Sequence, residues 1–387
     1  MAQQAAARLP FTSAALRYRE KFSARAAVTL GAAAQDVSPA GQVIKSYGYL
    51  RRLLIHVRGS GGTGGNLAVD APWNFFSQIS VTQPNGEEMF GGPTFTGYHA
   101  YLASLHAGRR LNDDPATWPS FSNVVTAPTF VLPITFEIDH EKGVGALPNQ
   151  DFSAPWKLQL TANVSTAVFL TAPTTAPTFT IDIYMDCWTV PSPVNALNPN
   201  VQQEVAPPLL GTLNKWTIQQ YAVPASSAFN VLLQRKGNAI RNLVFALRGS
   251  TGLRLTTAIF PDPLSFKWDG TVVRTDDRAT LIVDDEYGTR GGIAMTTPKP
   301  PEAGVIALQM SDVTGIDTQG AGEAFGMGAF WGTVQSSTIE MGGTWGTGAT
   351  TLEVLTNDVQ FVDLAGNPYA FAYGGYLQAP AQPGARP

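Results

Sequence analysis

Cysteine and charge are both scarce in this sequence. Its 387 residues include one cysteine, Cys187, and only 14% of them are charged. A single cysteine excludes an intramolecular disulfide framework, and its apolar surroundings indicate a small buried hydrophobe. Soluble proteins carry about 25% charged residues, so we expect other molecules, such as further copies of the chain, to cover much of the surface. The net charge of −4 argues against direct binding of nucleic acid, which favours a basic surface.

Long apolar runs are also missing. No stretch of the sequence reaches the roughly 18 consecutive apolar residues of a membrane-spanning helix. Charged residues interrupt the first 30 residues, which therefore do not resemble a signal peptide. Nothing in the sequence directs this chain to secretion or to membrane insertion.

Sequence patterns of catalysis and metal binding are absent as well. The four histidines occur without H-x-H or H-E-x-x-H, GSGGTGG lacks the lysine of a phosphate-binding loop, and no G-x-S-x-G is present. We interpret His99 and His106 as ordinary, partly buried histidines. We interpret Glu137, Asp139 and Glu141 as a solvated strand end. We therefore predict no catalytic, cofactor-binding or metal-binding residue, and no enzyme.

Glycine and proline are abundant by contrast, with 38 and 28 residues. Between them lie short segments rich in β-branched and aromatic residues, such as TFVLPITFEI, WKLQLTANVS and TFTIDIYMDCWTV. Many short strands separated by turn residues are typical of a sandwich or barrel. The predicted fold class is all-β.

One phrase occurs twice. RRLLIHVRGSGG begins at Arg51, and RNLVFALRGSTG begins at Arg241, 190 residues later. Both fit R-x-L-Φ-Φ-x-Φ-R-G-S-x-G, where Φ is apolar, and the second arginine is Arg58 in one copy and Arg248 in the other. A spacing of about half the chain exceeds the roughly 20–50 residues of solenoid repeats. It indicates a duplicated domain.

The landmarks after each phrase keep their order. A hairpin follows, with its turn at Asn85-Gly86 in the first copy and at Asp269-Gly270 in the second. Next comes a short helical segment, TGYHAYLASLHAG or DRATLIVDDEYG. The proline- and asparagine-rich residues 191–208 indicate a linker. We predict an N-terminal arm over 1–30, β domains over 31–190 and 209–378, and a loose tail over 379–387.

The N-terminal arm and the duplicated arginines are the candidate site residues. Residues 12–26 contain helix formers and a possible cap, and they predict a helix. The basic residues of this predicted helix are Arg17, Arg19, Lys21 and Arg25. We interpret the duplicated arginines as structural, because arginine binds a carboxylate through two hydrogen bonds and can hold a strand end in place. These residues are Arg51, Arg58, Arg241 and Arg248.

The ordered set of segments resembles one family. GYLRRLLIHV, DAPWNFFSQISVTQPNGEEMF, TGYHAYLASLHAG and LSFKWDGTVVRTDDR, taken in this order, resemble double jelly-roll major capsid proteins. The resemblance is to those of tectivirus-type phages, which are tailless, icosahedral and membrane-containing. It covers roughly residues 10–375.

This resemblance implies a fold and an assembly. The fold would be two tandem eight-stranded antiparallel jelly rolls with short flanking helices and an N-terminal helix. A homotrimer would present six jelly rolls as a pseudo-hexagonal tile of an icosahedral shell over an internal lipid membrane. The implied partners are further copies, vertex and minor capsid proteins, and the membrane, which the basic N-terminal helix would face. The protein would be located in the virion, and in the host cytoplasm during assembly.

Two other classes of protein remain as alternatives. A carbohydrate- or receptor-binding β-sandwich of the spike type could use Trp73, Trp118 or Trp345 as exposed aromatic contacts. A bicupin-type enzyme would need a histidine-rich metal set inside each barrel, which four scattered histidines do not supply.

Overall fold

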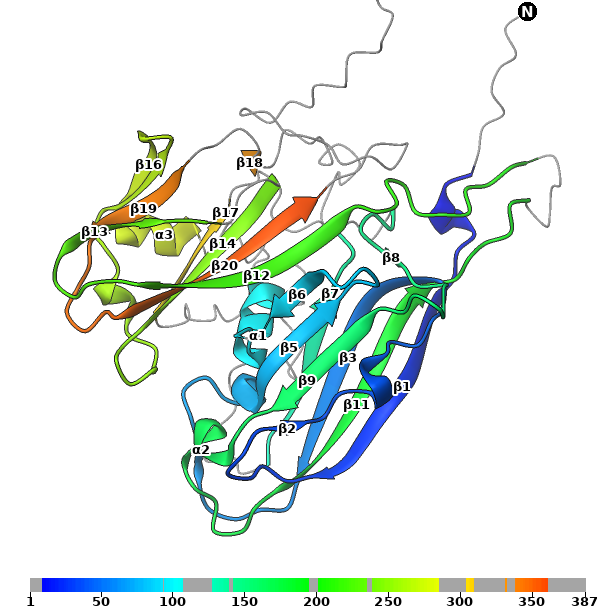
Figure 1. The fold of residues 1–387 in the computed structure, drawn as a ribbon, viewed down its shortest axis with the longest axis horizontal. Coiled ribbons are helices and arrows are strands. Elements are labelled where there is room, and N and C mark those ends of the chain that lie inside the picture. The colour runs from blue at the N-terminus through cyan, green and yellow to red at the C-terminus, as the bar shows by residue number, and fades with distance from the viewer. Residues whose placement is uncertain are drawn as a thin grey trace, which may run out of the picture. The chain divides into compact units, whose positions relative to one another are not determined.

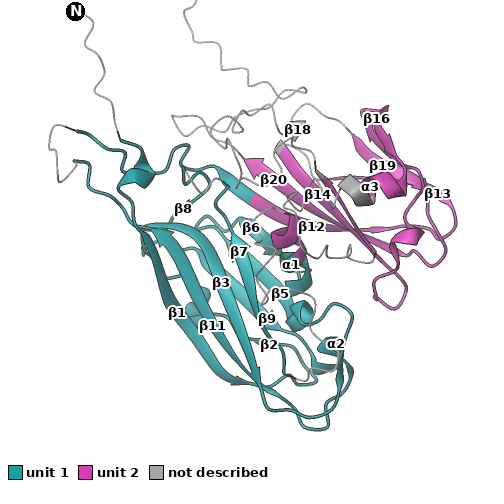
Figure 2. Ribbon diagram, turned by 180° about the vertical axis from the view of Figure 1, so that it is seen from behind, with its two compact units in different colours: residues 1–101, 113–214, 361–367 teal, residues 102–112, 215–360, 368–387 magenta. Residues whose placement is uncertain are grey.

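The computed structural model describes most of the chain and divides it into two compact units (Figure 1, Figure 2). Unit 1 comprises residues 1–101, 113–214 and 361–367, and unit 2 comprises residues 102–112, 215–360 and 368–387. The described residues are 9–92, 94–106, 127–138, 142–194, 201–234, 239–284, 304–309, 331–332 and 338–360.

Unit 1 is built from two antiparallel sheets of four main strands. One has the order β1-β11-β3-β7 and the other β6-β5-β9-β2. The strands are β1 (Arg17–Val28), β2 (Gln35–Asp36), β3 (Tyr49–Ser60), β5 (Phe76–Thr82), β6 (Glu88–Gly92), β7 (Thr129–Thr135), β9 (Lys157–Ala162) and β11 (Thr178–Trp188).

Aromatic side chains connect the two layers of unit 1. The Phe75 ring, at the start of one sheet, lies 4.9 Å from the ring of Phe179 and 6.0 Å from that of Phe130 in the other sheet. Alternate residues of the facing strands are buried, as in the pattern of β9 and of β7. The core therefore lies between the sheets, which is the arrangement that the period-2 pattern of these strands favours.

Unit 2 repeats this plan. Its sheets have the orders β17-β14-β20-β12 and β13-β19-β15-β16. One apolar cluster includes inward-facing residues of both sheets, such as Phe245 of β14 and Phe266 of β15. The strands are β12 (Leu213–Ala222), β13 (Ala228–Leu232), β14 (Ala239–Arg248), β15 (Leu264–Trp268), β16 (Thr271–Asp276), β17 (Val305–Gln309), β19 (Ile339–Thr344) and β20 (Thr351–Gln360).

The two units have the same topology. When the eight main strands of each unit are counted in chain order, one sheet reads 1-8-3-6 and the other 2-7-4-5, in both units. Eight antiparallel strands in two sheets with this order form a jelly roll. The predicted all-β class and the two tandem jelly rolls are confirmed.

The two predicted hairpins and the helix predicted after each of them are also present. β5 and β6 enclose the turn at Gly86, which has a φ of 90°, and β15 and β16 enclose Asp269 and Gly270, with φ of 47° and 80°. Asp269 and Gly270 form a two-residue turn, and positive φ at both is what a type I′ turn requires, whereas the first turn is longer and spans residues 83–87. In each unit a helix follows the fifth strand: α1 (Gly97–His106) and α3 (Arg278–Asp284).

Short elements complete the description. The described helices include none with the length and apolar character that crossing a membrane needs. The short elements are η1 (Phe11–Ser13), η2 (Ala40–Gln42), β4 (Asn66–Leu67), η3 (Trp73–Phe75), β8 (Leu147–Pro148), α2 (Ser165–Val168), β10 (Phe169–Thr171), η5 (Thr257–Ile259) and β18 (Trp331–Gly332).

The N-terminal helix prediction is wrong. Residues 17–28 form β1, which pairs antiparallel with β11 from Arg17 opposite Trp188 to Val28 opposite Phe179. Leucine, alanine, arginine and lysine favour a helix only weakly, and tertiary pairing overrides such propensities. The first jelly roll therefore begins inside the segment that we assigned to an N-terminal arm over 1–30.

The connection between the jelly rolls runs from Trp188 at the end of β11 to Leu213 at the start of β12. The predicted linker, 191–208, lies within it. Leu9 pairs with Gln203 in this connection, and its backbone N–H donates to the carbonyl of Gln202 at 3.0 Å. The predicted end of the second domain at 378 and the predicted tail over 379–387 lie outside the described residues.

Deleting residues 1–26 is expected to destabilise the first jelly roll rather than leave it folded. The deletion removes most of β1 and exposes the edge of β11. We expect the melting temperature to fall by at least about 10 °C, equivalent to roughly 3–5 kcal/mol for a unit of this size. Deletion of residues 1–8 is the control and should leave the melting temperature within about 2 °C. Equal melting temperatures for the two truncations would contradict the assignment of β1 as an integral strand.

Candidate functional site

The duplicated phrase occupies the third main strand of each jelly roll, β3 and β14. Each pairs with the eighth strand of its own unit, β11 or β20. Arg51 is the extra residue of β3 at a register shift in its pairing with β11. Arg241 is the extra residue of β14 at a register shift in its pairing with β20. An extra residue in one strand of an antiparallel pair is a β-bulge residue. The first arginines of the two phrases are therefore equivalent in structure.

The apolar positions of the phrase are equivalent too. In both strands the alternate apolar residues are buried and face the core between the sheets. They are Leu53, Ile55 and Val57 in β3, and Leu243, Phe245 and Leu247 in β14.

The second arginine of each phrase forms the same ion pair. Arg58 lies opposite Thr180 of β11 and binds Asp182, two residues further along that strand. Arg248 lies opposite Thr351 of β20 and binds Glu353, again two residues further along, with 2.6 Å from its Nε to the carboxylate. A diagonal, charge-assisted pair of this kind fixes the register of two strands.

The glycines that follow allow the chain to leave the strand. A Cβ on Gly59 would lie 2.6 Å from the backbone carbon of Ala127, which is closer than side-chain atoms can approach. Gly62 and Gly252 have φ of 79° and 76°, a region that favours glycine. The phrase is duplicated because both jelly rolls use the same bulge, core positions, ion pair and turn.

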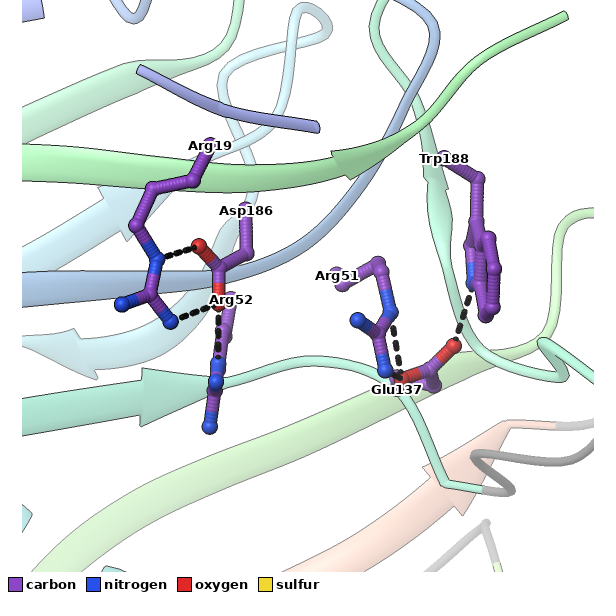
Figure 3. A network of polar contacts seen from close by, with 6 residues as sticks. All are labelled: Arg19, Arg51, Arg52, Glu137, Asp186 and Trp188. Carbon is purple, nitrogen blue, oxygen red and sulfur yellow. Dashed lines mark hydrogen bonds and ion pairs between the residues drawn. The ribbon is translucent and has the colours of Figure 1, made fainter. Parts of the chain in front are cut away.

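Arg51 is part of a buried network (Figure 3). Its guanidinium binds Glu137 at 2.7 and 2.9 Å, and Trp188 donates its indole N–H to the other carboxylate oxygen at 2.7 Å. The guanidinium carbon lies 4.4 Å from the centre of the Trp188 ring, within reach of a cation–π interaction. The Arg51 and Glu137 side chains are 8% and 1% exposed.

The interpretation of Glu137 as a solvated residue is wrong. Its flanking residues Phe136 and Ile138 are fully buried, and its backbone N–H donates to the carbonyl of Arg51 at 3.2 Å. The alternation of Phe136 and Ile138 with polar residues placed Glu137 on the outer side of a strand, so the local pattern carried no signal for its burial. Asp139 and Glu141 lie outside the described residues.

Arg241 has the same place in unit 2 and is 1% exposed. Burial lowers the pKa of its guanidinium to about 10. The direction follows from the cost of placing a charge away from water. At neutral pH this arginine is still a cation inside the second jelly roll.

The four basic residues of the N-terminal segment lie along β1 and do not form a basic helix face. Arg17 lies 5.2 Å from the centre of the Trp188 ring. Arg19 donates two hydrogen bonds to Asp186, at 2.5 and 2.9 Å, and the Nζ atom of Lys21 lies 3.7 Å from Asp182. These three residues alternate along one side of the strand.

Arg25 differs from the other three basic residues of β1. It is exposed and lies opposite Ile181, whose side chain is buried in the core. Because residues directly opposite each other in a ladder share a face, the Arg25 side chain is on the opposite side of β1 from Arg17, Arg19 and Lys21. The sequence-predicted basic set is therefore split between two sides of one strand.

Asp186 is held between two arginines of neighbouring strands (Figure 3). Arg19 of β1 and Arg52 of β3 both bind it, at 2.5 and 2.6 Å. Burial alone raises the pKa of this carboxyl, but the two arginine hydrogen bonds outweigh burial and hold the pKa below its usual value. The carboxylate therefore contributes stability above the pKa of an unfolded aspartate, and this contribution is lost as the pH falls through the lowered pKa.

The remaining candidates have structural surroundings. Burial raises the pKa of the Cys187 thiol to about 12, so little of it is the reactive thiolate at neutral pH. His99 accepts a hydrogen bond from the Thr96 backbone N–H at 3.0 Å on its Nδ1 and so caps α1. His106 is 2% exposed. Within the ranges that the structure describes, no three metal-ligating side chains gather.

The tryptophans that a spike-type protein would expose are buried where they are described. Trp73 stacks on Tyr101 with ring centres 4.5 Å apart, and Trp345 donates its indole N–H to the carbonyl of Phe229 at 3.0 Å. Both are 2% exposed or less. Trp118 lies outside the described residues.

Glu137→Gln is expected to destabilise unit 1 by about 3–5 kcal/mol, because it leaves the charge of Arg51 buried without its counterion. The double variant Arg51→Met/Glu137→Leu is expected to be less destabilised, since it removes both charges and keeps apolar volume. Urea denaturation of the three proteins measures this difference. A double variant less stable than the single one would contradict the dominance of the uncompensated charge.

The equivalent ion pairs of the two jelly rolls are expected to differ in strength. Glu353→Gln should cost about 1–3 kcal/mol, because the Arg248 side chain is only 14% exposed. Asp182→Asn should cost less than about 1 kcal/mol, because Arg58 and Lys21 are 58% and 47% exposed and regain water. Chemical denaturation of both variants tests the order, and the reverse order would show that exposure does not set the strength of these pairs.

Solved structures share this fold, whereas no family model matches the sequence and no curated protein matches it. The atomic structure of Sulfolobus Turreted Icosahedral Virus aligns with a TM-score of 0.56 at 13% identity, over 89% of this chain and 90% of that one. The PBCV-1 virus capsid aligns at 0.56 and 11% identity, over 92% and 97%. The Faustovirus major capsid protein aligns at 0.53 and 8% identity, over 93% and 92%. The chain thus has the fold of double jelly-roll major capsid proteins.

Proposed function

We propose that this chain is a major capsid protein, a structural protein without catalytic activity that builds the shell of an icosahedral virion. One observation carries the proposal: the two units have the same strand order, and the match to viral capsid structures extends over about nine-tenths of both chains. The scarcity of charge agrees with a surface that neighbours cover.

The proposed assembly unit is a homotrimer. Two jelly rolls of equal topology in one chain become six similar sandwiches around a threefold axis, so a trimer has a pseudo-hexagonal outline. Such tiles cover a shell with few kinds of contact between neighbours. This capsomer and the vertex and minor capsid proteins it would meet are part of the proposal, as are its location in the virion and in the host cytoplasm during assembly.

An internal membrane also remains in the proposal, as in the tectivirus-type phages that the sequence resembles. The element that would contact this membrane differs from the one expected from the sequence. Residues 17–28 are a strand of the first jelly roll, and Arg19 and Lys21 bind carboxylates of that jelly roll. A basic helix over 12–26 is therefore not the element that would touch lipid.

The two alternatives have less support. Trp73 and Trp345 are buried, so neither forms the exposed aromatic platform that a carbohydrate-binding sandwich uses. A bicupin-type enzyme needs histidine ligands inside each barrel. The strands of the second jelly roll begin at Leu213, and the four histidines, His56, His99, His106 and His140, all precede that residue.

Size-exclusion chromatography with light scattering tests the trimer. The chain mass is 41.2 kDa, so a closed trimer is expected at about 124 kDa, and this mass should persist on dilution. Electron microscopy of the same fraction should show hexagonal outlines. A monomer that is independent of concentration would contradict the proposed tile.

A further inference from the structure

The outer face of the β1-β11-β3-β7 sheet carries a row of paired charges, which we name the charge ladder. Its two carboxylates are on β11, each held between a cation of β1 and a cation of β3. Asp186 binds Arg19 and Arg52, and Asp182 binds Lys21 and Arg58.

The cations of the charge ladder are open to solvent, whereas its carboxylates are not. The Arg19, Lys21, Arg52 and Arg58 side chains are 53%, 47%, 37% and 58% exposed. The Asp186 and Asp182 side chains are 7% and 3% exposed. What this face presents to a partner is therefore positive charge.

The sign of this face is opposite to that of the rest of the chain. Four cations and two carboxylates give the charge ladder a net charge of +2, and the exposed Arg17 beside it on β1 makes +3. Since the whole chain has a net charge of −4, the remainder has −7. The rest of a second copy is therefore, in net charge, complementary to this face.

The composition of the face also fits contact with a protein. Between the two carboxylates, the ring of Tyr184 of β11 packs at a tilt against the ring of His56 of β3, with ring centres 4.7 Å apart. On β7 the uncharged Val131 and Pro133 lie opposite His56 and Leu54. Apolar and aromatic residues surrounded by arginines are typical of protein interfaces, in which lysine is depleted.

The unpaired edge of β1 is less suited to be the contact. Charged residues and bulges protect sheet edges against pairing with another strand. β1 has both, with register shifts between Lys21 and Ser23 and between Arg25 and Val28. A partner therefore meets the face of this sheet and not its edge.

We propose that the outer face of the β1-β11-β3-β7 sheet, centred on the charge ladder, docks against an acidic surface of a second copy of this chain. This inference rests on the proposed capsid function, because it names one of the contacts by which copies assemble. The contact joins two different surfaces, as a closed ring of three copies requires. It is electrostatic in part, so it weakens as salt is added.

The test compares two double variants that change the net charge of the chain equally. Arg19→Gln/Lys21→Gln lowers the charge of this face from +3 to +1 and leaves Arg52 on Asp186 and Arg58 on Asp182. The control, Arg25→Gln/Lys157→Gln, removes two exposed cations of unit 1 that are outside the charge ladder. Thermal melting confirms that both proteins are folded.

Sedimentation velocity and light scattering over a concentration series, at about 50 and 500 mM NaCl, measure self-association. We expect the face variant to associate about tenfold more weakly than wild type at low salt, and the control to match wild type. High salt should remove most of the difference, because exposed charges are then screened.

Three results would overturn the inference in distinguishable ways. If wild type and both variants associate equally, the trimer proposal stands and this face is not a contact between copies. If wild type is monomeric in all conditions, the trimer proposal and this inference both fail. If the face variant associates normally but loses binding to vesicles of three parts phosphatidylcholine to one part phosphatidylglycerol, the face is a lipid contact instead.

Discussion

The pairing of the third main strand with the eighth is the constraint on which both jelly rolls depend. It joins Arg58 to Asp182 and Arg248 to Glu353, which are 124 and 105 residues apart in sequence. The first and sixth strands add to the two sides of this pair in each unit. A slip of one residue would turn the buried leucines outward, and the bulge arginine with the diagonal ion pair opposes such a slip.

In addition to the strand order that both units share, the first jelly roll contains two networks of charged residues, one inside and one on its outer face. Inside, Arg51, Glu137 and Trp188 form a network in which each polar group has a partner, and Phe11 packs against Trp188 with ring centres 6.1 Å apart. Outside, the charge ladder uses buried carboxylates to hold exposed cations in fixed places. The same ion pairs that attach the edge strand β1 thus give one face of an acidic chain a positive charge.

The sequence was most informative where local rules decide the structure. Asp269-Gly270 and Gly86 predicted turns because few other residues adopt positive φ, and the alternating apolar residues predicted the strands of a sandwich. It misled at residues 17–28, whose helix-forming residues pair as a strand with β11, and at Glu137, whose carboxylate is buried with Arg51. In both cases the partner is distant in sequence, so no local pattern reveals it.

By itself the sequence determined that the chain is a duplicated all-β protein, because the repeated phrase, the hairpin turns and the helix after each hairpin are local features kept in order. It also pointed to arginines as structural residues. Only the tertiary structure decided which carboxylate each arginine binds, which side of β1 each basic residue occupies, and that the charge of one sheet face differs in sign from the rest of the chain. These depend on strand register between segments 86 to 167 residues apart, which packing of the two sheets sets and local sequence does not.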